Sequence, residues 1–165
     1  MSIPLRVLVL EDSESDAELM FHELRRAGYA PEWRRVQAEA EYLDCLGPGV
    51  DVVLADYNVP GFDLRRALEL VQQRELDIPF IVVSGTISEE VAVECMKAGA
   101  TDYLLKDRLA RLGPAVAQAL DRRRLREEKR NVEAALRERT NAMTLTKPFT
   151  VDDLRRALAV VAAPG

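Results

Sequence analysis

The sequence lacks the features that mark a membrane-spanning, secreted or nucleic-acid-binding protein. Its 165 residues contain no apolar run long enough to span a bilayer. The start, MSIPLRVLVLEDSESD, has one basic residue before a short apolar run and then acids, so no cleaved signal peptide is expected. A formal net charge of −5 argues against nucleic acid as a partner of the whole chain. These absences favour a soluble, cytoplasmic protein.

Cysteine is also scarce. Cys45 and Cys95 both fall in apolar patterns with helical spacing, so they are expected to be reduced core residues rather than a disulfide pair. With 48% apolar and 31% charged residues, the chain has the balance of a globular protein, and its length suffices for one domain and a little more.

Short apolar runs alternate with helical patterns along most of the chain. Strands are expected at residues 5–10, 31–37, 51–56, 78–85 and 101–106. Helices are expected at residues 15–29, 38–46, 63–73 and 88–100, with a long helix from about residue 112. The strand runs are continuously apolar, which suits a parallel sheet covered on both faces, and the more polar run 31–37 belongs near an edge. The sequence therefore predicts a doubly wound α/β fold with five parallel strands.

In the first of these helices, the apolar residues Leu19, Phe21, Leu24 and Ala27 lie close to helical spacing, and Gly28 is expected to end the helix.

Reactive side chains stand at the carboxyl ends of four expected strands, where ligands bind in sheets of this class. They are Glu11, Asp12, Asp56, Ser84 and Lys106. Three carboxylates in one cleft repel one another and favour a bound cation, and oxygen ligands suit Mg²⁺. A lysine and a hydroxyl can hold phosphoryl oxygens, while a carboxylate can act as the nucleophile. We therefore expect Asp56 to become an aspartyl-phosphate.

Four segments together resemble the receiver domain of two-component response regulators, over about Leu5 to Leu120. They are VLEDSESDAEL, LADYNVPGFD, IVVSGTISEE and AGATDYLLKD. The resemblance implies a flavodoxin-like strand order, 2-1-3-4-5. It also implies that the chain catalyses phosphoryl transfer to its own Asp56 from a phosphohistidine, on a sensor histidine kinase or a histidine phosphotransfer protein.

The same resemblance implies a metal-binding set for Mg²⁺. Asp12 and Asp56 would bind the ion directly, together with the main-chain carbonyl of Asn58. Glu11, at a position that often holds aspartate, would act through water.

The resemblance further implies a switch and a control on dephosphorylation. Ser84 and Lys106 would bind the phosphoryl oxygens, and Tyr103 would follow the hydroxyl inward. Asn58 and Thr86 would flank the attacking water and set the lifetime of the acyl phosphate, so slow self-dephosphorylation is expected. Asp107 stands where many receivers have proline, which predicts a differently shaped loop after the last strand.

Three other interpretations fit less of the sequence. FHELRR, around the single histidine His22, is similar to the phosphorylated box of histidine kinases, but the usual proline is missing and the sequence has no glycine-rich ATP site. An aspartate-nucleophile phosphohydrolase usually carries a second acid where this chain has Asn58. A phosphorylation-independent interaction or dimerisation module would not need the acids, Asp56, Ser84 and Lys106 together.

We expect a receiver domain at residues 1–120, a helical extension at 121–142 and a C-terminal segment at 143–165, with no DNA-binding or enzymatic output domain. Leu125, Val132, Leu136 and Met143 form a broken apolar seam that could pair two chains. Residues 143–161, MTLTKPFTVDDLRRALAVV, resemble the last strand and helix of a second receiver. The alternative is an amphipathic terminal helix that follows Lys-Pro-Phe by chance.

Overall fold

The computed structural model describes residues 1–86, 88–143, 152, 155–156 and 158, and it divides into two units, Met1–Arg123 and Arg124–Gly165. The strands of the first unit are β1 (Ile3–Leu10), β2 (Tyr29–Val36), β3 (Val52–Asp56), β4 (Phe80–Ser84) and β5 (Asp102–Leu105). Its helices are α1 (Glu14–Arg26), α2 (Glu39–Cys45), α3 (Leu64–Gln73) and α4 (Glu89–Lys97). A short 3₁₀ helix, η1 (Lys106–Arg111), precedes α5 (Leu112–Met143), which begins in the first unit.

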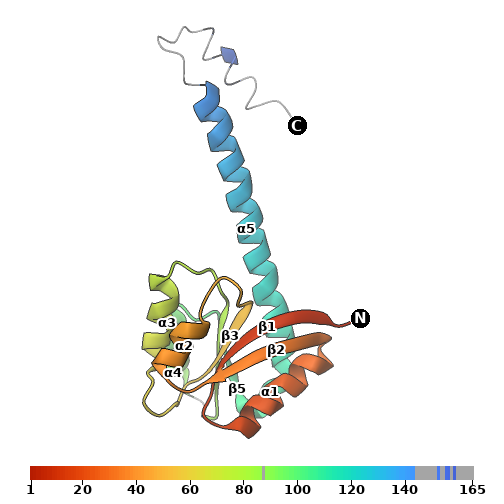
Figure 1. Cartoon of the computed structure of the whole chain (residues 1–165), viewed down its shortest axis with the longest axis vertical. Coiled ribbons are helices and arrows are strands. Elements are labelled where there is room, and N and C mark those ends of the chain that lie inside the picture. The colour runs from red at the N-terminus through yellow and green to blue at the C-terminus, as the bar shows by residue number, and fades with distance from the viewer. Residues whose placement is uncertain (87, 144–151, 153–154, 157, 159–165) are drawn as a thin grey trace. The chain divides into compact units, whose positions relative to one another are not determined.

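The five strands form one parallel sheet in the order β2-β1-β3-β4-β5 (Figure 1). This confirms the predicted fold class and strand order. β2 lies at the sheet edge, as its polar composition indicates, and every residue of β3 and β4 is buried, as their unbroken apolar runs predict. The helix signals hold as well, because the Ser88 hydroxyl caps α4 and Gly28 adopts a positive φ just after α1.

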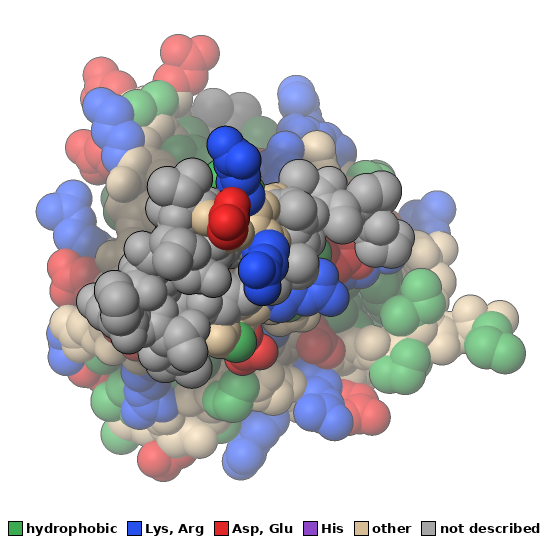
Figure 2. Space-filling view, turned by 90° about the horizontal axis from the view of Figure 1, so that it is seen from above, with side chains coloured by type: hydrophobic (Ala, Val, Ile, Leu, Met, Phe, Trp, Pro, Cys, Tyr) green, Lys and Arg blue, Asp and Glu red, His purple; other side chains and the backbone are tan. Residues whose placement is uncertain are grey.

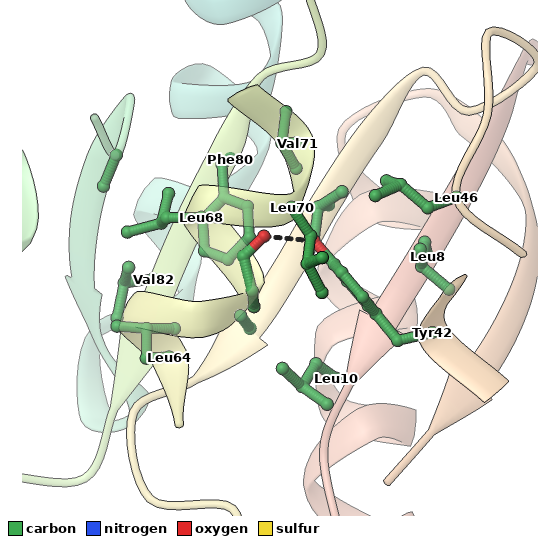
Figure 3. Packing of buried hydrophobic residues seen from close by; sticks show 14 of the residues in the cluster. Leu8, Leu10, Tyr42, Leu46, Leu64, Leu68, Leu70, Val71, Phe80 and Val82 are labelled. Carbon is green, nitrogen blue, oxygen red and sulfur yellow. Dashed lines mark hydrogen bonds between the residues drawn. The ribbon is translucent and has the colours of Figure 1, made fainter. Parts of the chain in front are cut away.

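Alternate residues of the central strands supply two separate cores, one on each face of the sheet. One core packs residues such as Leu8, Phe80 and Val82 against α2, α3 and α4 (Figure 3). The other packs the intervening strand residues against α1 and the start of α5. Helices cover both faces of the sheet, so charged groups are expected at the carboxyl ends of the strands.

One buried polar side chain sits inside the first core. The Tyr42 hydroxyl donates a hydrogen bond to the main-chain carbonyl of Ala67, 2.9 Å away (Figure 3). Burial raises the pKa of Tyr42, so its hydroxyl stays protonated and keeps donating.

The buried residues of α1 are Ala17, Met20, Phe21 and Leu24, which follow the i, i+3, i+4, i+7 spacing, whereas Leu19 is 54% exposed. One local prediction needs correction. β2 begins at Tyr29, two residues before the expected start, because it pairs with β1 from Ile3 onward. His22 is exposed on α1. Cys95 is buried in the first core and Cys45 is half-buried against it, and both are free thiols.

The second unit begins within α5, where Leu125, Val132 and Leu136 are exposed. Pairing of two chains through this stripe stays a prediction. The expectations for the 143–165 segment, including the resemblance to a second receiver, concern residues that lie mainly outside the described part of the chain. No described helix is both long enough and apolar enough to cross a membrane.

Charged side chains of both signs lie on the face of the molecule drawn in Figure 2. The face drawn in Figure 2 carries acidic and basic side chains side by side around its edge, and its described residues show no broad field of one sign there.

Candidate functional site

The predicted reactive residues gather at one edge of the sheet, and together they are called the edge site: Glu11, Asp12, Asp56, Ser84 and Lys106. Asp56 is the last residue of β3, and the register between β1 and β3 places Glu11 beside it. Ser84 ends β4 and pairs with Leu105, immediately before Lys106. Parallel pairing thus brings together residues up to 95 positions apart, as the sequence predicts.

Three carboxylates form the acidic half of the edge site. Glu11, Asp12 and Asp56 each offer an oxygen, and these atoms lie within 4.8 Å of one another. Glu11 is fully buried and Asp56 nearly so, whereas Asp12 is exposed. Two main-chain groups hold the buried pair, because Ser13 N donates to Glu11 Oε1 at 3.0 Å and Asn58 N donates to Asp56 Oδ1 at 3.4 Å.

Lys106 supplies the positive charge. Its Nζ lies 2.7 Å from Asp16 Oδ2, 3.0 Å from Glu11 Oε2 and 3.3 Å from Asp56 Oδ2. Burial alone lowers the pKa of the Lys106 ammonium, but the surrounding carboxylates more than reverse this and leave the pKa above its usual value. Lys106 is therefore a fixed cation at neutral pH.

The surroundings of Glu11 disfavour the ionised form of its carboxyl group. Burial raises the pKa of its carboxyl from 4.5 to about 6, and the nearby charge of Asp56 adds to this, against the hydrogen bond from Ser13 N and the pairing with Lys106. Its Oε2 atom is buried and, although close to Lys106, has no well-aligned hydrogen bond within the described residues. A buried carboxylate oxygen with spare capacity, beside two further carboxylates, is a donor set that fits Mg²⁺ or a metal-bound water.

Hydroxyl groups line the other side of the edge site. Ser84 is fully buried, and its Oγ accepts a hydrogen bond from Thr86 N at 3.3 Å, with Thr86 Oγ1 3.5 Å away. Tyr103 in β5 donates its hydroxyl to the main-chain carbonyl of Thr86 at 3.0 Å. Ser84, Thr86 and Tyr103 are thus linked through one loop, although they come from two strands and the turn after β4.

Sequence reasoning missed two residues that contact this region. Asp16, in the first turn of α1, makes the shortest contact with Lys106. Arg35, the penultimate residue of β2, donates to the main-chain carbonyls of Glu11 at 3.2 Å and Asp12 at 3.5 Å. The available signal was positional, because Arg35 lies near a strand's carboxyl end and Asp16 follows Asp12 by four residues.

The loop after β5 forms η1, a 3₁₀ helix that begins at Lys106 itself. Arg108 interrupts its helical geometry with φ −127° and ψ 40°. How this loop compares with the proline-containing loops of other receivers stays a prediction.

Comparison with known proteins agrees with this geometry. The chain is 37% identical over 93 residues to the C4-dicarboxylate transport transcriptional regulatory protein DctD of Pseudomonas aeruginosa, covering 56% of this chain and 20% of DctD. It is 32% identical over 108 residues to the two-component response regulator ORR6 of Oryza sativa, covering 62% of each. The chain thus spans less than two thirds of these relatives.

The fold matches solved structures too. A signal receiver domain from Vibrio parahaemolyticus superimposes with a TM-score of 0.66 at 24% identity, over 76% of this chain and 96% of that one. The sequence profile of the response regulator receiver domain matches residues 7–117, which include the whole edge site. This chain belongs to the response regulator receiver domain family, whose members act in two-component systems.

Proposed function

We propose that this chain accepts a phosphoryl group on Asp56 from a phosphohistidine, carried by a sensor histidine kinase or a histidine phosphotransfer protein. The observation that carries the proposal is the 3.3 Å contact between Lys106 Nζ and Asp56 Oδ2 within a cluster of three carboxylates. A carboxylate nucleophile, a donor set for a cation and a fixed ammonium meet at one point. Membership of the receiver family supports the same conclusion.

In the proposed reaction, an Asp56 carboxylate oxygen attacks phosphorus. The new P–O bond forms as the P–N bond to the histidine breaks, and the leaving imidazole nitrogen keeps the electron pair and is protonated from water. Lys106 and Ser84 contact the non-bridging phosphoryl oxygens, on which most of the charge resides. Transfer of this kind needs positioning and charge neutralisation more than covalent help from the protein.

The acidic half of the edge site would hold Mg²⁺. Asp12 and Asp56 would bind the ion directly with the main-chain carbonyl of Asn58, and Glu11 would act through a metal-bound water. The bound ion would supply positive charge beside the phosphoryl oxygens. Arg35 holds the loop that carries Asp12 through its bonds to two main-chain carbonyls.

Ser84 links phosphorylation to the protein surface. Its Oγ now accepts from Thr86 N, and when it turns to a phosphoryl oxygen the Thr86 loop loses that contact. Tyr103, bonded to the Thr86 carbonyl, then moves with the loop and changes the face on which a downstream protein partner binds. Asn58 and Thr86 flank the water that later hydrolyses the acyl phosphate, so they set its lifetime.

Intact-mass measurement tests the proposal. The protein is incubated with Mg²⁺ and a small acyl-phosphate donor or a phosphohistidine donor, beside Asp56→Asn and the matched control Asp44→Asn, an exposed aspartate on α2. We expect one added phosphoryl group in the wild type and in Asp44→Asn, and none in Asp56→Asn. Labelling of Asp56→Asn, or no labelling of the wild type by either donor, would contradict the proposal.

A further inference from the structure

The shortest charged contact in the edge site does not involve the phosphoacceptor. Lys106 Nζ lies 2.7 Å from Asp16 on α1 and 3.3 Å from Asp56. Among the three carboxylates around the ammonium, only Asp16 makes a well-aligned hydrogen bond to it. In the unphosphorylated protein, the closest partner of the Lys106 ammonium is therefore the Asp16 carboxylate.

Asp16 is held in place by its helix. The Ser13 hydroxyl caps α1 by accepting from Asp16 N at 3.2 Å, and Ser13 N is itself bonded to the Glu11 side chain. These contacts tie the first turn of α1 to the end of β1, so the Asp16 carboxylate is presented to Lys106 from a fixed backbone position.

Phosphorylation of Asp56 adds new hydrogen-bond acceptors for the Lys106 ammonium. A phosphoryl group on Asp56 brings additional negative charge and strong acceptor oxygens. An ammonium has three N–H donors, and three carboxylates already surround this one. The Asp56 contact passes to the new group, so the ammonium binds a phosphoryl oxygen closely only if it moves away from one of the other two carboxylates, Glu11 or Asp16.

Burial decides which contact is lost. The Glu11 side chain is fully buried, so loss of its ion pair would leave an uncompensated charge away from water. The Asp16 side chain is 35% exposed, so water can replace the ammonium there at little cost. Asp16 is the partner that Lys106 can most easily release.

We propose that Asp16 is a positioning residue that competes with the phosphoryl group for Lys106, so that the ammonium exchanges the Asp16 carboxylate for a phosphoryl oxygen when Asp56 is modified. The inference rests on the proposed function, in which Lys106 contacts that group. Asp16 thereby positions Lys106 close to Asp56. It also disfavours the phosphorylated state, because the ammonium must leave the Asp16 carboxylate to bind a phosphoryl oxygen.

The test uses beryllofluoride, which binds an aspartate carboxylate in the geometry of a phosphoryl group, titrated into the full chain with Mg²⁺. Asp16→Asn keeps the side-chain size but removes the competing charge, and a partly exposed ion pair contributes only a modest free energy. We therefore expect Asp16→Asn to tighten the apparent Kd about twofold to fivefold. Asp16→Glu, which retains the carboxylate, should return the Kd to the wild-type value.

Glu14→Gln is the matched control, because it removes an exposed acid from the same first turn, and it should leave the Kd unchanged. Weaker or unaltered binding by Asp16→Asn, or an equal effect of Glu14→Gln, would overturn the competition while leaving the proposed function intact. No binding by the wild type would instead overturn both, since the exchange then has no phosphoryl-like partner.

Discussion

The core on the α2, α3 and α4 side and the edge site each bury a polar side chain, and they treat it in opposite ways. In the core, the Tyr42 hydroxyl donates to the Ala67 carbonyl at 2.9 Å. In the edge site, Glu11 Oε2 is just as buried but has no well-aligned hydrogen bond within the described chain. The Lys106 ammonium lies 3.0 Å from that oxygen, but burial still disfavours the ionised carboxylate and raises its pKa. The core satisfies its buried polar group with a hydrogen bond, whereas the edge site holds a buried charge that a bound cation would stabilise further.

The two regions are built from the same strands. Leu8 and Leu10 of β1 pack into the core, and Glu11, the next residue, belongs to the edge site. The packed strands fix the backbone positions from which Glu11 and Asp56 project. Separate mutations in the two regions should therefore separate stability from phosphoryl chemistry.

The largest effect is expected from a cavity in the core. Leu8→Ala removes a side chain that is 1% exposed and packed near Tyr42, which should lower the free energy of unfolding by about 2–5 kcal/mol. Urea unfolding measures the loss. Phosphorylation of the protein that remains folded should match the wild type, and a specific loss of labelling would mean that the two regions are not separable.

A smaller effect, confined to the edge site, is expected from Lys106→Ala. Hydrogen bonds to charged groups contribute about 1.5–3 kcal/mol. Loss of the ammonium should therefore weaken beryllofluoride binding about tenfold to a hundredfold. Lys97→Ala, at an exposed position on α4, is the control for loss of one lysine. Equal affinities in the two variants would remove Lys106 from the proposed mechanism.

The pH dependence of the free energy of unfolding should reveal the cost of burying the ionised Glu11 carboxylate. The pKa of its carboxyl is about 6 in the folded protein, against 4.5 ordinarily, so between these values the folded state binds more protons than the unfolded state. Stability contributed by this group is therefore present below pH 4.5 and falls as pH rises through 6.

Urea unfolding of the wild type and Glu11→Gln, with a chelator present, measures this contribution as a difference. The wild type should lose roughly 1–2 kcal/mol relative to the variant between about pH 4 and about pH 7. A flat difference would show that Glu11 carries no burial cost, and a rising one would show that Lys106 overcompensates it.

The smallest effect is expected where the buried polar group is already satisfied. Tyr42→Phe removes the hydroxyl that donates to Ala67, and a typical hydrogen bond contributes about 0.5–1.5 kcal/mol. Thermal unfolding measures the change. A loss as large as that of Leu8→Ala would show that the Tyr42 hydroxyl has a greater structural role than one hydrogen bond.

Most of the fold can be predicted from the sequence because each βα unit repeats the same pattern. Continuous apolar runs fix the buried strands, and the polar residue that ends each run marks the shared edge. The grouping of the edge-site residues can be predicted without a structure, because the carboxyl ends of parallel strands all lie on the same side of the sheet. The buried face of α1 is harder to predict, because Leu19 and Met20 are adjacent apolar residues and the packing of the helix on the sheet decides which of them is buried.

Asp16 and Arg35 could not be found in the same way. An acid in the first turn of a helix has an ordinary explanation in the helix dipole, so Asp16 does not stand out. Its contact with Lys106 joins residues 90 positions apart and depends on the angle at which α1 leaves β1. Arg35 acts on main-chain carbonyls, which no side-chain pattern records.

The central claim is that the edge site exists to carry a phosphoryl group on Asp56. The most direct test is a time course of transfer from a phosphorylated histidine phosphotransfer protein, followed by intact mass and peptide mapping, with Mg²⁺ and with a chelator. We predict a single phosphoryl group on the peptide containing Asp56, formed only with Mg²⁺. A group on another residue, or transfer that is equally fast in the chelator, would contradict the account.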